Sequence, residues 1–225
     1  MTFSVTGRCE QTGMLGVAIA TSSICVASRC PWARAGVGAV ATQNITDPSI
    51  GNTLLDKLAA GRSAEAALAE LLSSGAQNLE YRQIAVVDNQ GGFAHHSGDK
   101  TLGISNVTAK TNCVAAGNIL SATEVTITMA ERFSATPALH LAPRLLGALQ
   151  AGLSAGGEMG PVKSCGLLVV DEQPWPLVDL RCDWDDAPIC RLNDLWEAYQ
   201  PQMDDYVVRA LDPSSMPAYM APDSR

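Results

Sequence analysis

Strand-like and helix-like segments follow one another in blocks along this chain, and this order restricts the fold more than any other feature. Short apolar runs separated by turn residues come first, helical patterns follow, and both kinds then recur. Links of hairpin length between successive strands favour antiparallel sheets with helices outside them over alternating βαβ units. We therefore predict an α+β fold in which two antiparallel sheets pack face to face, each with helices on its outer side. The predicted strands span 2–6, 13–23, 35–44, 82–89, 91–98, 112–118, 163–172 and 175–184, and the predicted helices span 47–61, 64–75, 121–133, 138–157 and 191–200.

The first predicted strand, "TFSVT", carries a clear alternation. Thr2, Ser4 and Thr6 fall on one face, and Phe3 and Val5 fall on the other. This period is typical of a strand that is buried on one side only.

Capping residues and helix breakers mark the predicted helices. Gly61 is placed to stop the first helix and Ser63 to cap the second. Ser121 and Glu124 fit a capping box at the start of the third helix. Pro143 is expected to kink or restart the fourth helix.

The composition argues against several classes of function. Hydrophobic residues make up 47% of the 225 residues and charged residues only 17%, as in a compact globular protein. The net charge is −8 and no stretch is basic, so we expect no binding to nucleic acid or to an anionic membrane surface. The apolar runs are too short to span a bilayer, and no secretory signal is visible.

The cysteines indicate neither a zinc site nor a redox site. The chain has seven cysteines, widely scattered and without a C-x-x-C pair. We expect a cytoplasmic protein with no cofactor and no metal. We divide it into a single domain at 1–200 and a C-terminal extension or arm at 201–225.

The opening residues, "MTFSVTG", make Thr2 a candidate nucleophile. Initiator methionine is normally trimmed when a small residue such as threonine follows it, which would leave Thr2 as the first residue of a strand. An α-amino group has an ordinary pKa of about 7.7–8.0, so it serves as a general base near neutral pH. A threonine hydroxyl paired with its own α-amine is one way to activate a weak nucleophile. The competing interpretation is that Met-Thr is an ordinary protein start.

Several motifs together indicate a family. The sequence contains "MTFSVTGRCEQTGMLGVAIATS", "AGVGAVATQN", "GRSAEAALAELL", "EYRQIAVVDNQGG", "AAGNIL" and "VDLRCDWDDAPICRLNDL". With these motifs the chain resembles, from Thr2 to Tyr199, the bacterial domain-of-unknown-function family numbered one thousand and twenty-eight, within the N-terminal-nucleophile (Ntn) hydrolase superfamily. The resemblance implies a four-layer αββα sandwich and, by analogy with the superfamily, hydrolysis of an amide bond. It implies no particular substrate.

The resemblance also implies roles for individual residues. Thr2 takes the nucleophile position, and Gly117 with Asn118 matches a family motif that could form an oxyanion hole, although a plain turn is an equal alternative. Gln43 and Asn44 end a strand that borders the nucleophile in such folds. They could donate hydrogen bonds to a substrate or simply cap a loop.

Charged residues supply further candidates for substrate binding. Arg8 and Arg82 could clamp a substrate carboxylate, or each could pair with a surface acid. Arg181 and Asp183 share one face of a strand and match the closing strand of the family, as an ion pair or as a substrate-orienting pair. The segment "EMGPVKSCG", with Lys163 and Ser164, departs from the more basic stretch that the resemblance implies, so we expect any substrate contact there to differ.

We carry three hypotheses from the sequence. The first is a hydrolase of a small amide or peptide-like substrate, in which Met1 is removed and Thr2 uses its own α-amine as base. The second is a catalytically silent member of the fold that binds a small molecule or serves in assembly. The third, ranked last, is a metal-dependent hydrolase using His95 or His96. The composition permits a homo-oligomer without indicating one.

Overall fold

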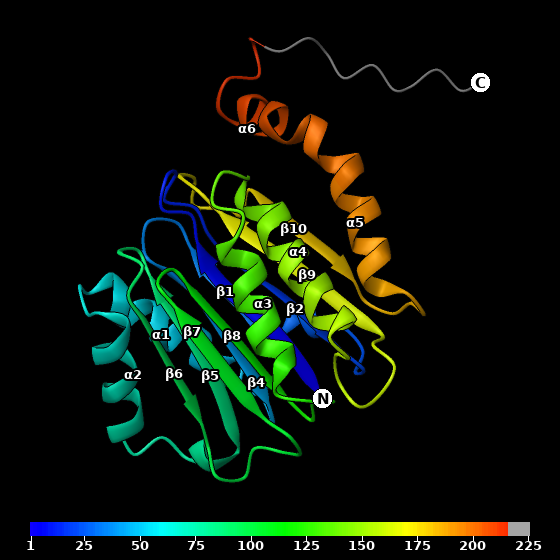
Figure 1. Cartoon of the computed structure of the whole chain (residues 1–225). Helices are drawn as coiled ribbons and strands as arrows, with labels where there is room; N and C mark the ends of the chain where they lie inside the picture. Colours follow the sequence, from blue (N-terminus) through cyan, green and yellow to red (C-terminus); the bar gives the residue numbers. More distant parts are fainter. Residues whose placement is uncertain (216–225) are drawn as a thin grey trace.

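The computed structural model describes residues 1–215 and shows a sandwich of two antiparallel sheets (Figure 1). From edge to edge, the larger sheet consists of β10 (Val178–Cys182), β9 (Ser164–Val170), β2 (Leu15–Thr21), β1 (Thr2–Arg8), β8 (Cys113–Asn118) and β7 (Asn106–Lys110). The smaller sheet consists of β3 (Pro31–Arg34), β4 (Gly38–Asn44), β5 (Arg82–Asp88) and β6 (Phe93–Ser97). All these neighbours pair antiparallel, as the short links predict.

Helices cover the outer face of each sheet and complete four layers. α1 (Ser49–Ala59) and α2 (Ala64–Ser73) pack on the smaller sheet, and α3 (Glu124–Ser134) and α4 (Leu141–Ser154) lie across the larger one, as Figure 1 shows. α5 (Pro188–Tyr199) packs against β9 and β10, and α6 (Met203–Leu211) follows it. Single 3₁₀ turns span Val26–Ser28, Leu79–Tyr81 and Gln200–Gln202. The predicted αββα sandwich is confirmed. None of the helices within residues 1–215 combines the length and apolarity needed to cross a bilayer.

The buried core has three layers, one between the sheets and one beneath the helices on each side. Small and β-branched side chains dominate the layer between the sheets: Leu15, Val17, Ala39, Ala41, Ala85, Val87, Val114, Ala116 and Val170. Larger side chains lie beneath the helices, among them Phe3, Met129, Phe133, Leu145 and Leu149 on the larger sheet and Leu54, Leu68 and Ile84 on the smaller. Small residues let the two sheets approach closely, which explains how a chain with 5% aromatic residues fills its core.

β1 lies inside the larger sheet and is buried on both faces. Phe3 and Val5 belong to the core cluster formed with α3 and α4. Ser4 points the other way, and its Oγ donates to Oε1 of Gln43 on the smaller sheet at 2.7 Å. The expectation of a half-buried strand is therefore wrong, because the second sheet covers the face that carries Thr2, Ser4 and Thr6.

Two strands, β3 and β7, have no counterpart among the predicted elements. Both are edge strands, and most of their residues are only partly buried. A strand that is half covered does not need the strong apolar pattern that marks the interior strands. Their short sequences, "PWAR" and "NVTAK", show no such pattern.

The helix boundaries agree with the sequence at some positions and differ at others. Ser63 caps α2 as predicted, since its side chain accepts a hydrogen bond from the Ala66 amide at 3.2 Å. The predicted capping box is wrong: the Ser121 hydroxyl instead donates to the Gly157 carbonyl, and α3 begins only at Glu124. Pro143 neither kinks nor restarts α4, because the helix begins at Leu141 and proline fits its first turn.

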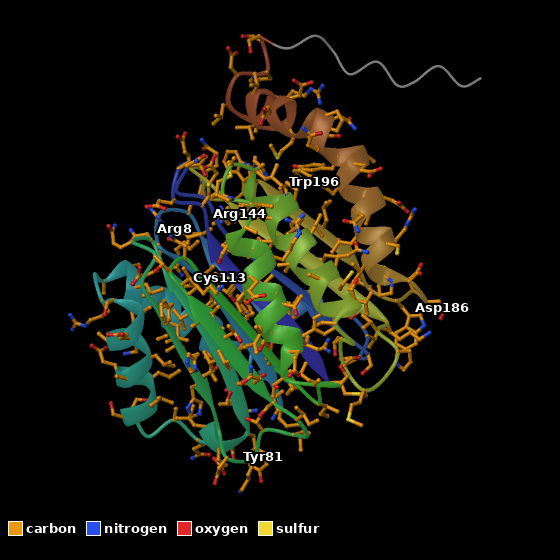
Figure 2. All side chains as sticks on the ribbon, in the orientation of Figure 1. Arg8, Tyr81, Cys113, Arg144, Asp186 and Trp196 are labelled. Atoms are coloured by element: carbon orange, nitrogen blue, oxygen red, sulfur yellow. The ribbon has the colours of Figure 1, made fainter. Side chains whose placement is uncertain are left out.

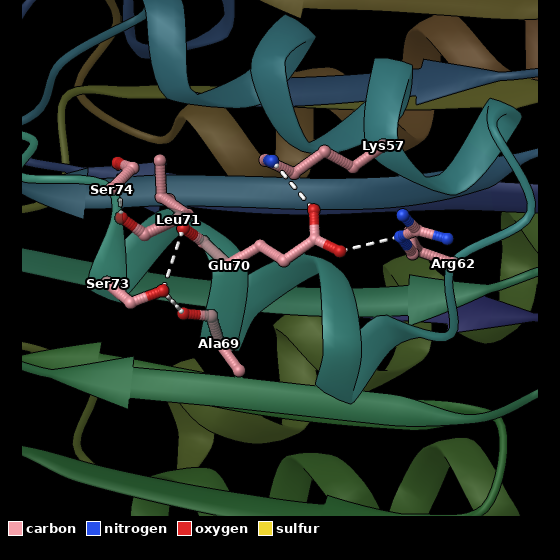
Figure 3. Close-up of polar contacts among 7 residues, drawn as sticks. All are labelled: Lys57, Arg62, Ala69, Glu70, Leu71, Ser73 and Ser74. Atoms are coloured by element: carbon pink, nitrogen blue, oxygen red, sulfur yellow. Dashed lines mark hydrogen bonds and ion pairs between the residues drawn. The ribbon is translucent and has the colours of Figure 1, made fainter.

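Glu70 joins the two helices of the smaller sheet on their exposed side. Its carboxylate accepts hydrogen bonds from Nζ of Lys57 at 2.9 Å and from Nε of Arg62 at 2.6 Å (Figure 3). Hydrogen bonding to Lys57, and then to Arg62, holds the pKa of Glu70 below its ordinary value. The contact orders the link between α1 and α2 and lies on the far side of the smaller sheet from β1.

The segment expected to be a C-terminal extension, 201–225, contains helix α6. Tyr206 of this helix stacks on Tyr199 of α5, with ring centroids 5.9 Å apart. Residues 216–225 of the extension lie outside the described part of the chain.

Candidate active site

Four polar residues form a row across one end of the larger sheet. Thr2 on β1 is the register partner of Asn118 on β8, and Thr21 on β2 is the partner of Ser164 on β9. The hydroxyl oxygens of Thr2 and Thr21 lie 3.3 Å apart, which joins the two pairs. Residues opposite one another in neighbouring strands share a face of the sheet, so these side chains all lie on the side of the smaller sheet.

The Thr2 hydroxyl is buried beneath the residue that precedes it. Thr2 is only 6% exposed. Its hydroxyl hydrogen-bonds the carbonyl oxygen of Met1, and the hydroxyl of Thr21 donates to the same oxygen. Ser23 extends the group, with its Oγ 3.2 Å from that of Thr21. A carbonyl oxygen therefore already sits between two hydroxyls at the start of β1.

A chain of buried amide side chains links the two sheets beside this row. Ser4 bonds Gln43, and Nε2 of Gln43 donates to Oε1 of Gln83 at 2.7 Å. Gln83 Oε1 also accepts from Nδ2 of Asn118 at 3.0 Å, and Gln83 Nε2 donates to the Gly117 carbonyl at 3.0 Å. All four of these polar side chains are fully or almost fully buried. The network holds the Asn118 amide in place next to Thr2, and low local dielectric strengthens each of these bonds.

A buried carboxyl group stands near the N-terminal amine. Glu158 is 5% exposed and precedes β9, in a loop that forms an isolated bridge with Leu120. Burial raises the pKa of Glu158 to about 7, an effect partly opposed by the N-terminal amine and by Ser22. Burial also lowers the pKa of the Met1 amine, with Glu158 and then Cys30 opposing that change. The Ser22 hydroxyl and amide lie close enough to lower the pKa of Glu158 by hydrogen bonding, although no group among residues 1–215 meets ordinary hydrogen-bond geometry at either carboxylate oxygen.

These groups provide the parts of a nucleophilic site. A hydroxyl at a strand start and nearby donors are what attack on a carbonyl requires, and the α-amine of Thr2 would be freed as a base only by removal of Met1. Burial further raises the pKa of the Cys30 thiol to about 11, so this neighbouring cysteine stays a neutral thiol.

Comparison with known proteins identifies the family. The model of a family of unknown function, DUF1028, matches residues 2–192. The chain belongs to this family. The crystal structure of SPO2555 from Silicibacter pomeroyi, also of DUF1028, superposes with a TM-score of 0.83 at 30% identity and covers 91% of this chain and 92% of that one. No curated protein matches with significance.

Two further solved structures cover most of the DUF1028 chain at low similarity. Anbu (ancestral beta-subunit) from Yersinia bercovieri has 10% identity and a TM-score of 0.39, covering 97% of this chain and 100% of that one. An Anbu mutant from a Hyphomicrobium strain has 13% identity and a TM-score of 0.40, covering 92% and 99%. Similarity at this level carries no argument about function.

In this chain, some of the site residues predicted from the sequence lie together. Thr2, Gly117 and Asn118 lie side by side on β1 and β8, and Gln43 reaches them through Gln83. The roles assigned to these residues stay predictions.

Arg8 lies at the opposite end of β1 from Thr2. They are six residue steps apart along an extended strand, which is about 20 Å. The Arg8 guanidinium donates to Oδ1 of Asn112 at 3.2 Å, and Figure 2 shows Arg8 far from Tyr81 at the other end of the sandwich. Arg8 therefore lies away from Thr2, and its role as a substrate clamp stays a prediction.

Asn44 and Arg82 hold loops at the end of the smaller sheet that lies nearest Thr2. Nδ2 of Asn44 donates to the Tyr81 carbonyl at 2.6 Å, and its Oδ1 accepts from the Leu102 amide at 3.3 Å. Asn44 has a φ of 71°, which suits asparagine at a turn. The Arg82 guanidinium donates to the Ile45 carbonyl. Of the two interpretations open for Asn44, the structure supports the loop cap.

Arg181 and Asp183 lie at the edge of the larger sheet and do not reach Thr2. Arg181 forms a two-pronged pair with Asp179 on the same strand, with both distances 2.8 Å. Asp183 is exposed, and its carbonyl accepts from the Cys25 amide. Of the two interpretations open for Arg181 and Asp183, the ion pair is not formed: β10 ends at Cys182, Asp183 lies beyond the strand, and Arg181 pairs with Asp179 instead.

The histidines contribute no metal centre within the described residues. His96 bonds the Leu79 carbonyl through Nε2 at 3.0 Å. Burial lowers the pKa of His95, with His96 adding to the effect. Across residues 1–215, no group of three or more His, Cys, Asp or Glu side chains is arranged to hold a metal ion.

Sequence reasoning missed Thr21, Ser23, Gln83 and Glu158. Gln83 had a usable signal, since it is a polar residue inside the apolar run "RQIAVV". Thr21 ends the strand "LGVAIAT" that pairs with β1, but only the register places it beside Thr2. Glu158 lies in the segment "EMGPVKSCG", and nothing in its local sequence indicates burial.

Proposed function

We propose that this DUF1028 protein hydrolyses a small amide or peptide-like substrate, with Thr2 as nucleophile once Met1 is removed. The observation that carries the proposal is the carbonyl oxygen of Met1, which sits between the hydroxyls of Thr2 and Thr21. A substrate carbonyl in that place would meet the Thr2 oxygen and a hydroxyl donor together. We further propose that the substrate is a small molecule and that the protein acts in the cytoplasm.

The reaction follows from the groups at the start of β1. The Thr2 oxygen attacks the substrate carbonyl carbon, and its proton passes to the Thr2 α-amine. The protonated amine returns that proton to the leaving nitrogen, so that the C–N bond breaks and an acyl ester of Thr2 remains. Water, deprotonated by the same amine, then cleaves the ester to release the acid and restore the hydroxyl.

Donors beside Thr2 would stabilise the charge that develops on the substrate oxygen. The Thr21 hydroxyl is the first of these, and Ser23 supports it at 3.2 Å. Asn118 is the second, because its amide nitrogen carries two hydrogens and Gln83 takes one. Gly117 positions Asn118, since its own carbonyl is held by Gln83. Such a donor is typically worth about 2.7–4 kcal/mol in the transition state.

The test begins with the intact mass of the protein from its native host and from a host with excess methionine aminopeptidase. A mass short by one methionine would free Thr2. The trimmed protein, Thr2→Ala and Thr2→Ser would then be compared on a library of amides. Thr6→Ala is the matched control, since Thr6 is buried on the same strand and the same face. We expect activity in the wild type and Thr6→Ala and none in Thr2→Ala; full-length mass under both conditions would refute the proposal.

A second candidate function is supported by the position of Met1. The Thr2 hydroxyl is engaged in a hydrogen bond to the Met1 carbonyl. This arrangement is expected of a catalytically silent protein that binds a small molecule. Retained Met1 together with small-molecule binding would favour this function.

A further inference from the structure

The Glu158 side chain is a buried carboxyl group with few polar neighbours. The residue is 5% exposed, Ser22 is the donor that acts on its carboxyl, and no group among residues 1–215 meets ordinary hydrogen-bond geometry at either carboxylate oxygen. An unpartnered buried carboxylate is costly, and a protein retains one where a ligand group completes it. None of the steps described for Thr2 uses Glu158.

Met1 shows what kind of group fits in front of Glu158. Its carbonyl oxygen is held by the hydroxyls of Thr2 and Thr21. A Cβ placed on Gly160 would lie 3.2 Å from the Met1 sulfur, so the side chain rests on the glycine two residues after Glu158. Its amine lies close enough to Glu158 for each to affect the pKa of the other. Met1 is thus an aminoacyl group whose carbonyl and side chain are seated in the site and whose amine interacts electrostatically with Glu158.

Removal of Met1 would empty the space that its backbone and side chain fill. The hydroxyl of Thr21 would become free to donate to another carbonyl oxygen, and the space beside Gly160 would accept another side chain. Glu158 would lose its electrostatic interaction with the Met1 amine. A second aminoacyl group is the chemistry that satisfies all three positions.

We propose that the Thr2 site takes amides of α-amino acids with a free amine, and that Glu158 binds the substrate ammonium. The proposal rests on the proposed function, since it assigns the acyl half of the substrate that Thr2 attacks. Glu158 would then set specificity, because a charge-assisted bond to a buried carboxylate requires a cation on the substrate. An N-acylated amide would leave the carboxylate unpaired and bind less well.

The kinetic experiment compares methionine 4-nitroanilide with its N-acetyl form on the trimmed protein. We expect the free amine to be preferred, and Glu158→Gln to lower kcat/KM for it by ~10- to 100-fold, mainly through KM. The N-acetyl substrate should respond little, and Glu158→Asp should restore part of the loss. Glu197→Gln, at an exposed position on α5, is the control. Equal losses on both substrates would overturn the proposal and assign Glu158 to the Thr2 amine.

A binding measurement separates this proposal from the proposed function. Trimmed Thr2→Ala would be titrated with methionine amide and with N-acetylmethionine amide by calorimetry, with and without Glu158→Gln. Binding of the free amine alone, lost on Glu158→Gln, supports the proposal even if the wild type turns over no substrate. Turnover of N-acetyl amides without binding of methionine amide overturns it and leaves the hydrolase intact.

Discussion

Glu158→Gln should change how the stability of the protein depends on pH. Burial raises the pKa of Glu158 from its ordinary value of 4.5 to about 7 in the folded protein. Between those two values the folded protein holds a proton that the unfolded chain has released. The free energy of unfolding of the wild type therefore falls as pH rises through this window, and glutamine removes that dependence.

The magnitude follows from the size of the pKa change. One pKa unit is worth about 1.36 kcal/mol, so a change from 4.5 to about 7 amounts to about 3 kcal/mol in full. Most of it, roughly 2–3 kcal/mol, is expressed between about pH 5 and about pH 8. Near pH 5 the folded carboxyl is neutral, so the free energy of unfolding of Glu158→Gln should be close to that of the wild type. Near pH 8 the variant should be more stable than the wild type by roughly 2–3 kcal/mol.

Urea unfolding followed by tryptophan fluorescence measures the effect, since the chain has four tryptophans. Wild type and variant are compared at both pH values in the same N-terminal form, so that titrating groups that do not interact with Glu158 cancel in the difference. The N-terminal amine does interact with Glu158, and its contribution is therefore part of the measured effect. Glu197→Gln, at an exposed position, should shift the curves equally at both pH values. A stability difference between Glu158→Gln and wild type that stays constant with pH would refute the reasoning, because it would mean that Glu158 ionises like a solvated carboxyl.

Two further predictions concern the packing that positions the site. Gln83→Leu should lower the free energy of unfolding by about 3 kcal/mol or more, because it leaves the buried Asn118 amide and Gly117 carbonyl without their hydrogen-bond partner. Ser97→Ala removes only one contact of Gln83 and should cost about 1 kcal/mol in the same urea denaturation assay. Gly16→Ala should cost about 1–3 kcal/mol, because a Cβ there would lie 2.4 Å from the Leu168 carbonyl oxygen. In a thermal melt Gly147→Ala is its control: this helical glycine has its nearest atom at 3.4 Å, and alanine should be neutral or stabilising there.

Much of the fold could be predicted because its signals are local. The turn "DNQGG" joins β5 and β6 as expected, and Ser63 caps α2 through a bond to a residue three positions away. Interior strands were found because two covered faces demand an apolar run. β3 and β7 were missed because these two edge strands carry no apolar run, whereas the edge strands β6 and β10 were found.

The sequence by itself determined the order of strands and helices, the family and the candidacy of Thr2, because each depends on neighbouring residues or on motifs read along the chain. Only the tertiary structure decided which polar residues meet. Thr21 reaches Thr2 through strand register, and Gln83 reaches Asn118 across the gap between two sheets. Arg8 shares a strand with Thr2 and yet lies about 20 Å from it. Distance along the chain says little about distance in a sandwich, since its contacts are set by pairing between strands far apart in sequence.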